Sequence, residues 1–478
     1  MKKERLAEII EKRKEDFIAL SREIWSRPEL SLQEFHAAEV YTKLLAKEGF
    51  RVETGLCGIE TAFSGAFGSG RPVIGILGEF DALDGLSQEA CLPERKPLVR
   101  GGCGHGCGHN LLGAAAFAAA VAVKEYLQER GTGTVIFYGC PGEEGGAAKA
   151  FMARDGVFAD LDAALTWHPE DVNEIASGSC MASLQKEYRF VGRASHAAGA
   201  PQKGRSGLDA AELMNLGAQY LREHLAPGDM VHYCFSDAGG MSPNVVQSEA
   251  QVLYMVRSSN VAGAKAVLQR VDKIAEGAAL MSDVRMTSRF IDGTSDTLPN
   301  HALERVLWKN FSETPLPDYT PDDRALAEKI CRTYEREGLP GSFCHEDANA
   351  AAFVEAASEH GTRAINDFLI PYVPSSRTRP GSTDVGDVSH LTPTGQIHVA
   401  CFPAGTPGHS WQLTSTGVSD MAHKGMLLAA KVLAATAYDL YESPALLAEA
   451  RTEFVACADN WTSPIPQGAV PTLPGEVF

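Results

Sequence analysis

The residues best suited to chemistry lie in a glycine-rich stretch at positions 101–110. Cys103, His105, Cys107 and His109 alternate there with glycine, so four side chains that bind transition metals fall within a few positions. Glycine allows the backbone to bend until these side chains converge, whereas so many glycines disfavour the interior of a strand. The stretch predicts a tight metal-binding loop that ends at Asn110, the N-cap of a long helix. A zinc knuckle that only stabilises the fold is the alternative, because structural and catalytic sites share these ligand types.

A pair of adjacent glutamates, Glu143 and Glu144, follows the apolar run 134–138 and precedes two glycines. Neighbouring residues on a regular element point in different directions. One glutamate can therefore bind a metal ion while the other faces the attacking water as a general base. The alternative is a solvated pair of charges, but a position just after a buried strand favours a functional pair.

Two isolated histidines, His168 and His409, extend this set. Each one alone is more commonly a structural histidine than a metal ligand. With Cys107, His109 and Glu144 they provide five ligands that combine nitrogen, oxygen and sulfur atoms. Five ligands exceed the number that one closed tetrahedral site accepts, and they fit two ions that share a water molecule.

Three continuous apolar runs, 73–77, 134–138 and 163–167, must position these residues. Each run predicts a buried parallel strand, and polar residues follow each one at its C-terminal end, where open α/β sheets build active sites. Asp81 follows the first run and could orient a histidine ligand through a hydrogen bond, or it could be a turn residue. The chain is predicted to be an α/β protein whose catalytic domain has a mixed or parallel sheet.

The pattern changes between residues 183 and 296, where strand and helix signals follow the order β-α-β-β-α-β. This order is the signature of a ferredoxin-like domain. Its position predicts an insertion into a catalytic domain whose two halves are residues 1–182 and 297–478.

The composition is that of a soluble globular protein, with 44% hydrophobic and 22% charged residues. A formal net charge of −18 argues against nucleic acid or an anionic membrane as a partner, and an anionic substrate would need a local cation. We find no signal-peptide pattern, and we expect no apolar run of transmembrane length. The chain is therefore expected in the cytoplasm, with its eleven cysteines mostly reduced.

Five motifs in this order resemble those of the aminoacylase/carboxypeptidase superfamily of co-catalytic metallohydrolases, in its amidohydrolase branch. The motifs are Cys107–His109, Pro141–Gly146, Trp167–Pro169, Gly192–Ala198 and Gly408–His409. Four further segments resemble a subgroup that hydrolyses p-aminobenzoyl-glutamate: Gly104–Gly113, Tyr138–Gly142, Ser242–Val246 and Ser382–Asp387.

The resemblance implies that two divalent ions, Mn²⁺ or Zn²⁺, are bound by the five ligands Cys107, His109, Glu144, His168 and His409. It implies that Glu143 is the base, and that His196 of the inserted domain enters the active site of a partner chain and stabilises the developing oxyanion. It also implies that Asn244 and Arg257 hold the substrate carboxylate. A thiolate ligand favours zinc, whereas the subgroup resembles manganese enzymes. Many relatives carry aspartate directly after the ligand histidine, where this chain has Asn110.

The expected reaction is hydrolysis of the amide between an aromatic acyl group and glutamate, by a homodimer or by a heteromer with a homologous A subunit. Two alternatives remain open at this stage. The chain could hydrolyse other N-acyl or auxin-type amino-acid conjugates, or it could be a metal-binding subunit that supports a catalytic paralogue.

Overall fold

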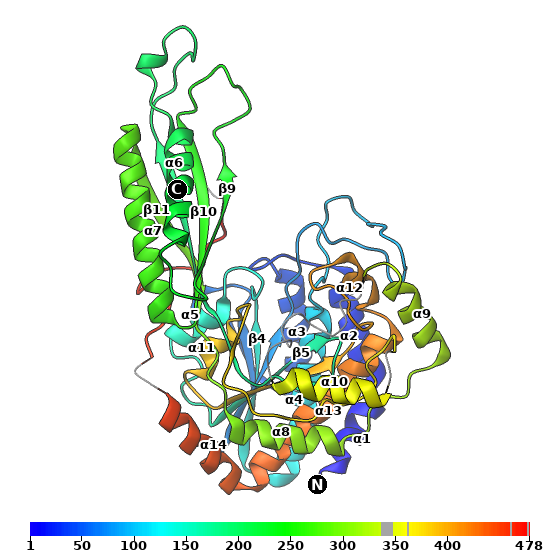
Figure 1. Ribbon diagram of the computed structural model, residues 1–478. Coiled ribbons are helices and arrows are strands. Elements are labelled where there is room, and N and C mark those ends of the chain that lie inside the picture. The colour runs from blue at the N-terminus through cyan, green and yellow to red at the C-terminus, as the bar shows by residue number, and fades with distance from the viewer. Residues whose placement is uncertain (336–347, 361–362, 459–460, 476–477) are drawn as a thin grey trace.

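The computed structural model describes residues 1–335, 348–360, 363–458, 461–475 and 478. A larger part is built on a seven-stranded sheet, and a smaller part with a four-stranded sheet projects from it (Figure 1). The C-terminal Phe478 lies on the smaller part, where the Arg289 guanidinium stacks over its ring at 4.5 Å.

The seven-stranded sheet has the order β1-β2-β4-β3-β5-β13-β6. Its strands are β1 (Arg51–Thr54), β2 (Phe63–Ser69), β3 (Val73–Glu79), β4 (Gly133–Cys140), β5 (Ala163–Glu170), β6 (Glu174–Ile175) and β13 (Thr394–Ala400). The four central strands β4, β3, β5 and β13 are parallel, and β1, β2 and β6 pair antiparallel to their neighbours. The carboxyl ends of the three predicted strands therefore meet at one edge, as the sequence predicted, although His168 lies within β5 rather than after it.

Two long helices, α4 (His109–Arg130) and α13 (Asp420–Glu442), pack against each other and against this sheet. Alanines dominate the centre of α4 and allow a close approach to β3, β4 and β5. Among the described residues, α4 is the one helix long and apolar enough to cross a membrane, contrary to the expectation of none. However, 94% of that apolar window is buried inside the protein, so α4 serves as a core helix.

The predicted N-cap at Asn110 is wrong. The helix α4 begins at His109 after Gly108, whose φ of 82° lies in the left-handed region that glycine tolerates. Asn110 is inside the helix, and its side-chain amide donates to Ser21 Oγ at 2.9 Å and to the Gly417 carbonyl at 3.0 Å. The buried Asn110 therefore links the start of α4 to two distant segments through hydrogen bonds.

The N-terminal segment forms two helices, α1 (Glu4–Lys12) and α2 (Lys14–Ser26), because the backbone leaves the helical region at Arg13. A further helix, α14 (Pro444–Cys457), follows α13. The remaining helices of the larger part are α3 (Phe35–Lys47), α5 (Ala148–Arg154), α8 (His301–Glu313), α9 (Pro321–Cys331), α10 (Ala348–His360), α11 (Val385–Ser389) and α12 (Trp411–Thr416), with a short 3₁₀ turn at Leu56–Gly58. Two short strands, β7 (Ser179–Cys180) and β12 (Thr378–Arg379), pair in parallel.

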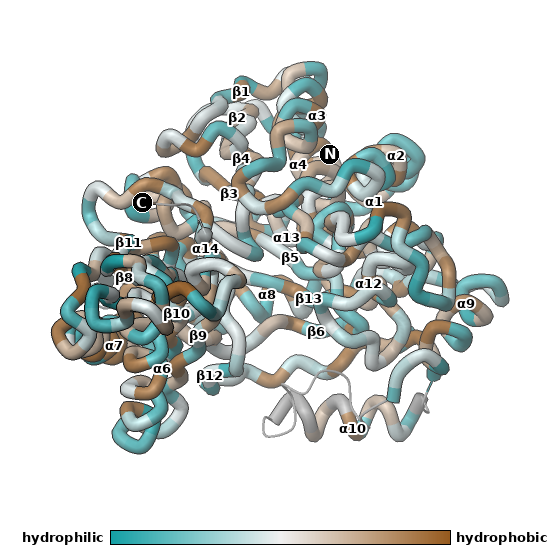
Figure 2. The backbone as a smooth tube through the Cα atoms, turned by 90° about the horizontal axis from the view of Figure 1, so that it is seen from above, coloured by the Kyte–Doolittle hydropathy of each residue, from teal (hydrophilic) through white to brown (hydrophobic). Residues whose placement is uncertain are grey.

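The smaller part follows the predicted element order β-α-β-β-α-β. It comprises β8 (Ala182–Val191), α6 (Gly207–Arg222), β9 (Met230–Asp237), β10 (Glu249–Ser258), α7 (Val261–Ser282) and β11 (Arg285–Thr294), with a 3₁₀ turn at Pro201–Lys203. Its strands are antiparallel in the order β11-β8-β10-β9, and they share a hydrophobic core with α6 and α7 that is separate from the core of the larger part. Seen from above, this part lies to one side of the seven-stranded sheet (Figure 2).

Candidate metal centre

The five predicted ligands converge at the carboxyl edge of the large sheet. The ligand atoms of Cys107, His109 and His168 lie within 4.8 Å of one another, and so do those of Cys107, Glu144 and His409. Cys107 belongs to both groups, so its thiolate could join two neighbouring ions. The sequence predicted that two ions share a water, and the geometry gives the two ligand groups a common sulfur atom.

The spacing of these atoms fits metal ions. Ligands about 2.1 Å from an ion in a tetrahedral arrangement lie about 3.4 Å apart. Cys107 Sγ is 3.3 Å from His168 Nε2, and His409 Nε2 is 3.3 Å from Glu144 Oε1. His109 Nε2 is buried and makes no hydrogen bond within the described part of the chain, which suits a nitrogen that is reserved for an ion.

Electrostatics favour the metal-binding form of the thiol. Burial and Glu144 disfavour a thiolate, but His168 and His109 outweigh them and lower the pKa of Cys107 to about 7. His409 is the most exposed ligand, with 57% of its side chain accessible, and its φ of 51° is unusual for a residue other than glycine. The loop after β13 thus presents this imidazole from the open side of the centre.

Asp81 connects the two loops that carry the ligands. Its Oδ1 lies 2.7 Å from His109 Nδ1, while Oδ2 accepts from Ser31 Oγ and from the Glu144 backbone N–H, both at 2.9 Å. The hydrogen bond to Nδ1 leaves Nε2 of His109 for a metal ion and fixes the ring. Asp81 therefore lies where a carboxylate can orient His109, and it is not a member of the ligand groups.

Glu143 lies next to the ligands but in a different group, together with Glu79 and His109. Burial first, and then the charges of Glu79 and Glu144, raise the pKa of the Glu143 carboxyl above its usual value. A carboxylate with a raised pKa accepts a proton more readily, which is what a general base requires.

The other predicted site residues lie on the smaller part. His196 and Asn244 are exposed and neighbouring, because the loop after β8 pairs with the loop before β10 through a bridge between His196 and Val245. The Asn244 carbonyl accepts from the Ala197 N–H at 3.0 Å. The His196 ring is turned towards its own loop, where Nδ1 accepts from the backbone N–H of Gly199 at 3.0 Å. The structure does not bring either residue to the metal ligands of the same chain.

Arg257 lies at the opposite end of β10, and it donates to Ser382 Oγ at 2.7 Å. The eight residue steps from Glu249 to Arg257 span roughly 27 Å of extended strand. Asn244 precedes Glu249, so Asn244 and Arg257 of one chain cannot hold the same carboxylate as predicted. Among the described residues, no carboxylate ion-pairs with the half-buried Arg257.

Sequence reasoning assigned no role to four charged residues near the centre: Glu79, Lys149, Glu170 and Asp384. Glu170 Oε1 is 3.4 Å from His168 Nδ1, a charge contact without the hydrogen bond that Asp81 makes to His109. The sequence contained a signal for Glu170, because residues two apart on a strand, such as His168 and Glu170, lie on the same face. Lys149 and Asp384 gave no local signal, since they meet through the fold alone.

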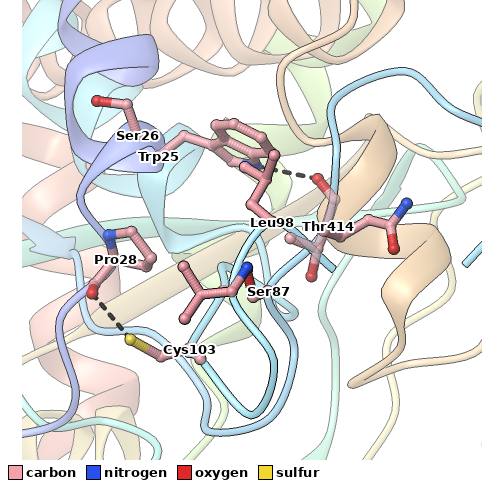
Figure 3. Close-up of a pocket in the computed structure, with 11 residues that line it drawn as sticks. Trp25, Ser26, Pro28, Ser87, Leu98, Cys103 and Thr414 are labelled. Carbon is pink, nitrogen blue, oxygen red and sulfur yellow. Dashed lines mark hydrogen bonds between the residues drawn. The ribbon is translucent and has the colours of Figure 1, made fainter. Parts of the chain in front are cut away.

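The first two ligand candidates of the glycine loop are not in the metal cluster. Cys103 Sγ donates to the Pro28 carbonyl at 2.9 Å, and His105 Nε2 lies 3.2 Å from the Ile24 carbonyl, so both fasten the loop to the end of α2. Cys103 also lines a cavity of about 280 Å³ with Trp25, Leu98 and other residues (Figure 3). None of the clustered ligands lines this cavity, which is mostly apolar.

An α/β sheet with clustered Cys, His and Glu ligands and a buried neighbouring glutamate at its carboxyl edge defines a metal-dependent hydrolase. Residues 75–395 match the peptidase family M20/M25/M40, and the chain belongs to that family.

Individual relatives agree with this assignment. The chain is 43% identical to the B-type subunit of p-aminobenzoyl-glutamate hydrolase from Escherichia coli, over 97% of each chain. It is 28% identical to the human Xaa-Arg dipeptidase, over 94% of this chain and 91% of that protein. The crystal structure of an aminobenzoyl-glutamate utilization protein from Klebsiella pneumoniae has the same fold, with a TM-score of 0.56 at 16% identity over 88% of this chain and 98% of that one.

Proposed function

We propose that the protein hydrolyses the amide bond of p-aminobenzoyl-glutamate, a folate catabolite, to p-aminobenzoate and glutamate. The observation that carries this proposal is the pair of ligand groups that share Cys107, with Glu143 beside them. The 43% identical relative supports the choice of substrate.

In the proposed site, Cys107, His109 and His168 would hold one divalent ion, and Cys107, Glu144 and His409 would hold the other. When bound, the ions would polarise the amide carbonyl and acidify the attacking water. Glu143 takes the proton of that water as its oxygen bonds to the carbonyl carbon, and then donates the proton to the amine nitrogen as the C–N bond breaks. The ions are Mn²⁺ or Zn²⁺, because a thiolate, imidazoles and a carboxylate suit either.

Arg257 is the proposed partner of the glutamate side of the substrate. The net charge of −18 repels a dianionic substrate everywhere except near a fixed cation. The Arg257 guanidinium is paired only with a neutral hydroxyl, that of Ser382, among the described residues. It can therefore donate to a substrate carboxylate without leaving a protein carboxylate unpaired.

The test is a panel of aroyl- and indolyl-amino acids, assayed on the purified single chain with saturating Mn²⁺ or Zn²⁺. The p-aminobenzoyl-glutamate conjugate should give the highest kcat/KM. Arg257→Ala should raise its KM by about 10- to 100-fold, the usual worth of a charged hydrogen bond, and should change the KM of the glutamate diamide far less. Arg270→Ala, on the exposed face of α7, is the matched control. A chain that is inactive on every conjugate would instead be a supporting subunit. Equal increases in KM for the conjugate and for its diamide would show that Arg257 does not bind the substrate carboxylate.

We further propose that residues 183–296 contact a second chain, either a copy of this one or a homologous A subunit. The edge strand β9 exposes Phe235, and α6 exposes Leu216 and Tyr220, so the smaller part presents apolar surface beside an unpaired strand edge. His196 and Asn244 would then enter the active site of the neighbouring chain together, which explains why they lie beside each other and away from Arg257.

This assembly predicts complementation in a homodimer. His196→Ala and Glu143→Gln chains should each be nearly inactive, while a mixture should recover up to about a quarter of wild-type activity. Random exchange makes half of the dimers hybrids, and each hybrid has one site with both an intact Glu143 and a donated His196. Native mass spectrometry of tagged chains verifies the exchange. If exchanged mixtures stay inactive, His196 does not act across the interface between two chains.

A further inference from the structure

A fully buried lysine lies beside the proposed metal centre. The Lys149 ammonium is 2.8 Å from Glu79 Oε1 and 2.6 Å from Asp384 Oδ1, and at most 3% of any of these three side chains is exposed. Asp384 also accepts from the Lys149 backbone N–H at 2.9 Å. Lys149 is therefore fixed at both ends, because one carboxylate binds its backbone and its ammonium at the same time.

Glu79 is the other partner of this lysine, and it borders a third group of possible ligands. Atoms of Glu79, His109 and Glu143 lie within 4.8 Å of one another, and Glu79 Oε2 is 3.4 Å from His109 Nε2. Two carboxylates and an imidazole would suit a divalent ion as well as the two proposed groups do. An ion there would compete for His109 and would bind Glu143, the residue that must stay available to accept a proton.

The lysine is charged in this environment. Burial opposes the ammonium, but Asp384 and Glu79 more than offset it and raise the pKa of Lys149 above its usual value. Its ammonium contacts the carboxylate of Glu79, which would complete the third ligand group, and this positive charge repels an approaching cation.

We propose that Lys149 is a positioning residue whose ammonium neutralises the Glu79 carboxylate and so keeps the Glu79–His109–Glu143 group free of a cation. The inference rests on the proposed two-metal site, since it concerns which ligands the ions use. Removing the ammonium would leave Glu79 and Asp384 as buried, uncompensated carboxylates beside Glu143, and a third divalent ion is the simplest replacement for the lost charge.

The experiment counts metal ions per chain by plasma mass spectrometry and native mass spectrometry after equilibration with excess Mn²⁺. The wild type should bind two ions, Lys149→Met three, and the double variant Glu79→Gln/Lys149→Met two again, because the third group has lost a carboxylate. Lys149→Arg should behave as the wild type, since it keeps the charge. Lys124→Met is the matched control, because Lys124 is also a buried lysine paired with two glutamates, Glu48 and Glu125, but lies roughly 22 Å along α4 from His109.

The outcomes separate the two proposals. A wild type that binds no ions contradicts the proposed function itself. A wild type and a folded Lys149→Met variant that both bind two ions overturn only the role of Lys149. If Lys149→Met does not fold, the Glu79→Gln variant is used instead. A variant that retains two ions supports the proposal. A variant that loses an ion shows that Glu79 is a metal ligand, which overturns the proposal. A second readout is inhibition of the folded Lys149→Met variant by Mn²⁺ at concentrations that the wild type tolerates.

Discussion

Replacement of Glu143 by glutamine should lower kcat by about two to four orders of magnitude, the usual worth of a positioned base. Glutamine keeps the size of the side chain and its ability to hydrogen-bond, but it cannot accept the proton of the attacking water. Bound metal should remain, because Glu143 is in neither of the two groups that share Cys107. Steady-state kinetics together with metal analysis of the purified variant measure both parts of this expectation.

The adjacent glutamate is the matched control for this experiment. Glu144 lies with Cys107 and His409, and its backbone N–H is held by Asp81. Glu144→Gln should therefore lose metal as well as activity. If Glu143→Gln loses metal while Glu144→Gln retains it, the roles of the two residues are exchanged.

Cys107→Ser should abolish turnover and remove both ions, a larger loss than any other single ligand should cause. The reason is that Cys107 is the one residue common to both predicted groups, and a serine hydroxyl is a much poorer ligand than a thiolate. His409→Ala, which alters one group only, should retain the ion held with His109 and His168. Metal analysis after dialysis distinguishes the two results.

Cys103→Ser is the matched control in the same loop, because the Cys103 thiol donates to the Pro28 carbonyl and lies in none of the ligand groups. This variant should keep both ions. Thermal unfolding monitored by circular dichroism should show that chelation leaves the fold largely intact, since the ligands cluster at one edge of the sheet and the hydrophobic core is formed by other residues. Unfolding on chelation, as in a zinc finger, would restore the interpretation of the loop as a structural knuckle.

The sequence was most informative where a local pattern implies a local structure. The apolar runs before Asp81, Glu143 and His168 predicted three strands, and parallel pairing brings their ends together. The smaller part was predicted element by element because alternation in strands and periodicity in helices are properties of short windows. The ligand residues could be proposed before any geometry was known because few side-chain types bind transition metals.

Contacts between distant segments had no such local signal. The sequence treated Asn110 as a cap, whereas tertiary contacts with Ser21 and Gly417 place it inside α4. The sequence predicted that Asn244 and Arg257 hold one carboxylate, whereas the length of β10 separates the two residues within a single chain. Lys149 looked like any lysine of a short helix, and only the fold surrounds it with Glu79 and Asp384.

Residue types and short-range periodicity in the sequence predicted the class of fold and a set of candidate metal ligands, and the resemblance to a known family selected Glu143 as the candidate base. The tertiary structure decided how the ligands divide into groups, that Cys107 is shared between two of them, and which charged residues surround Glu143. The physical reason is that a ligand group is defined by distances of a few ångströms between atoms on different loops. Those distances are fixed by strand pairing and helix packing, which bring together residues as far apart in the chain as Cys107 and His409.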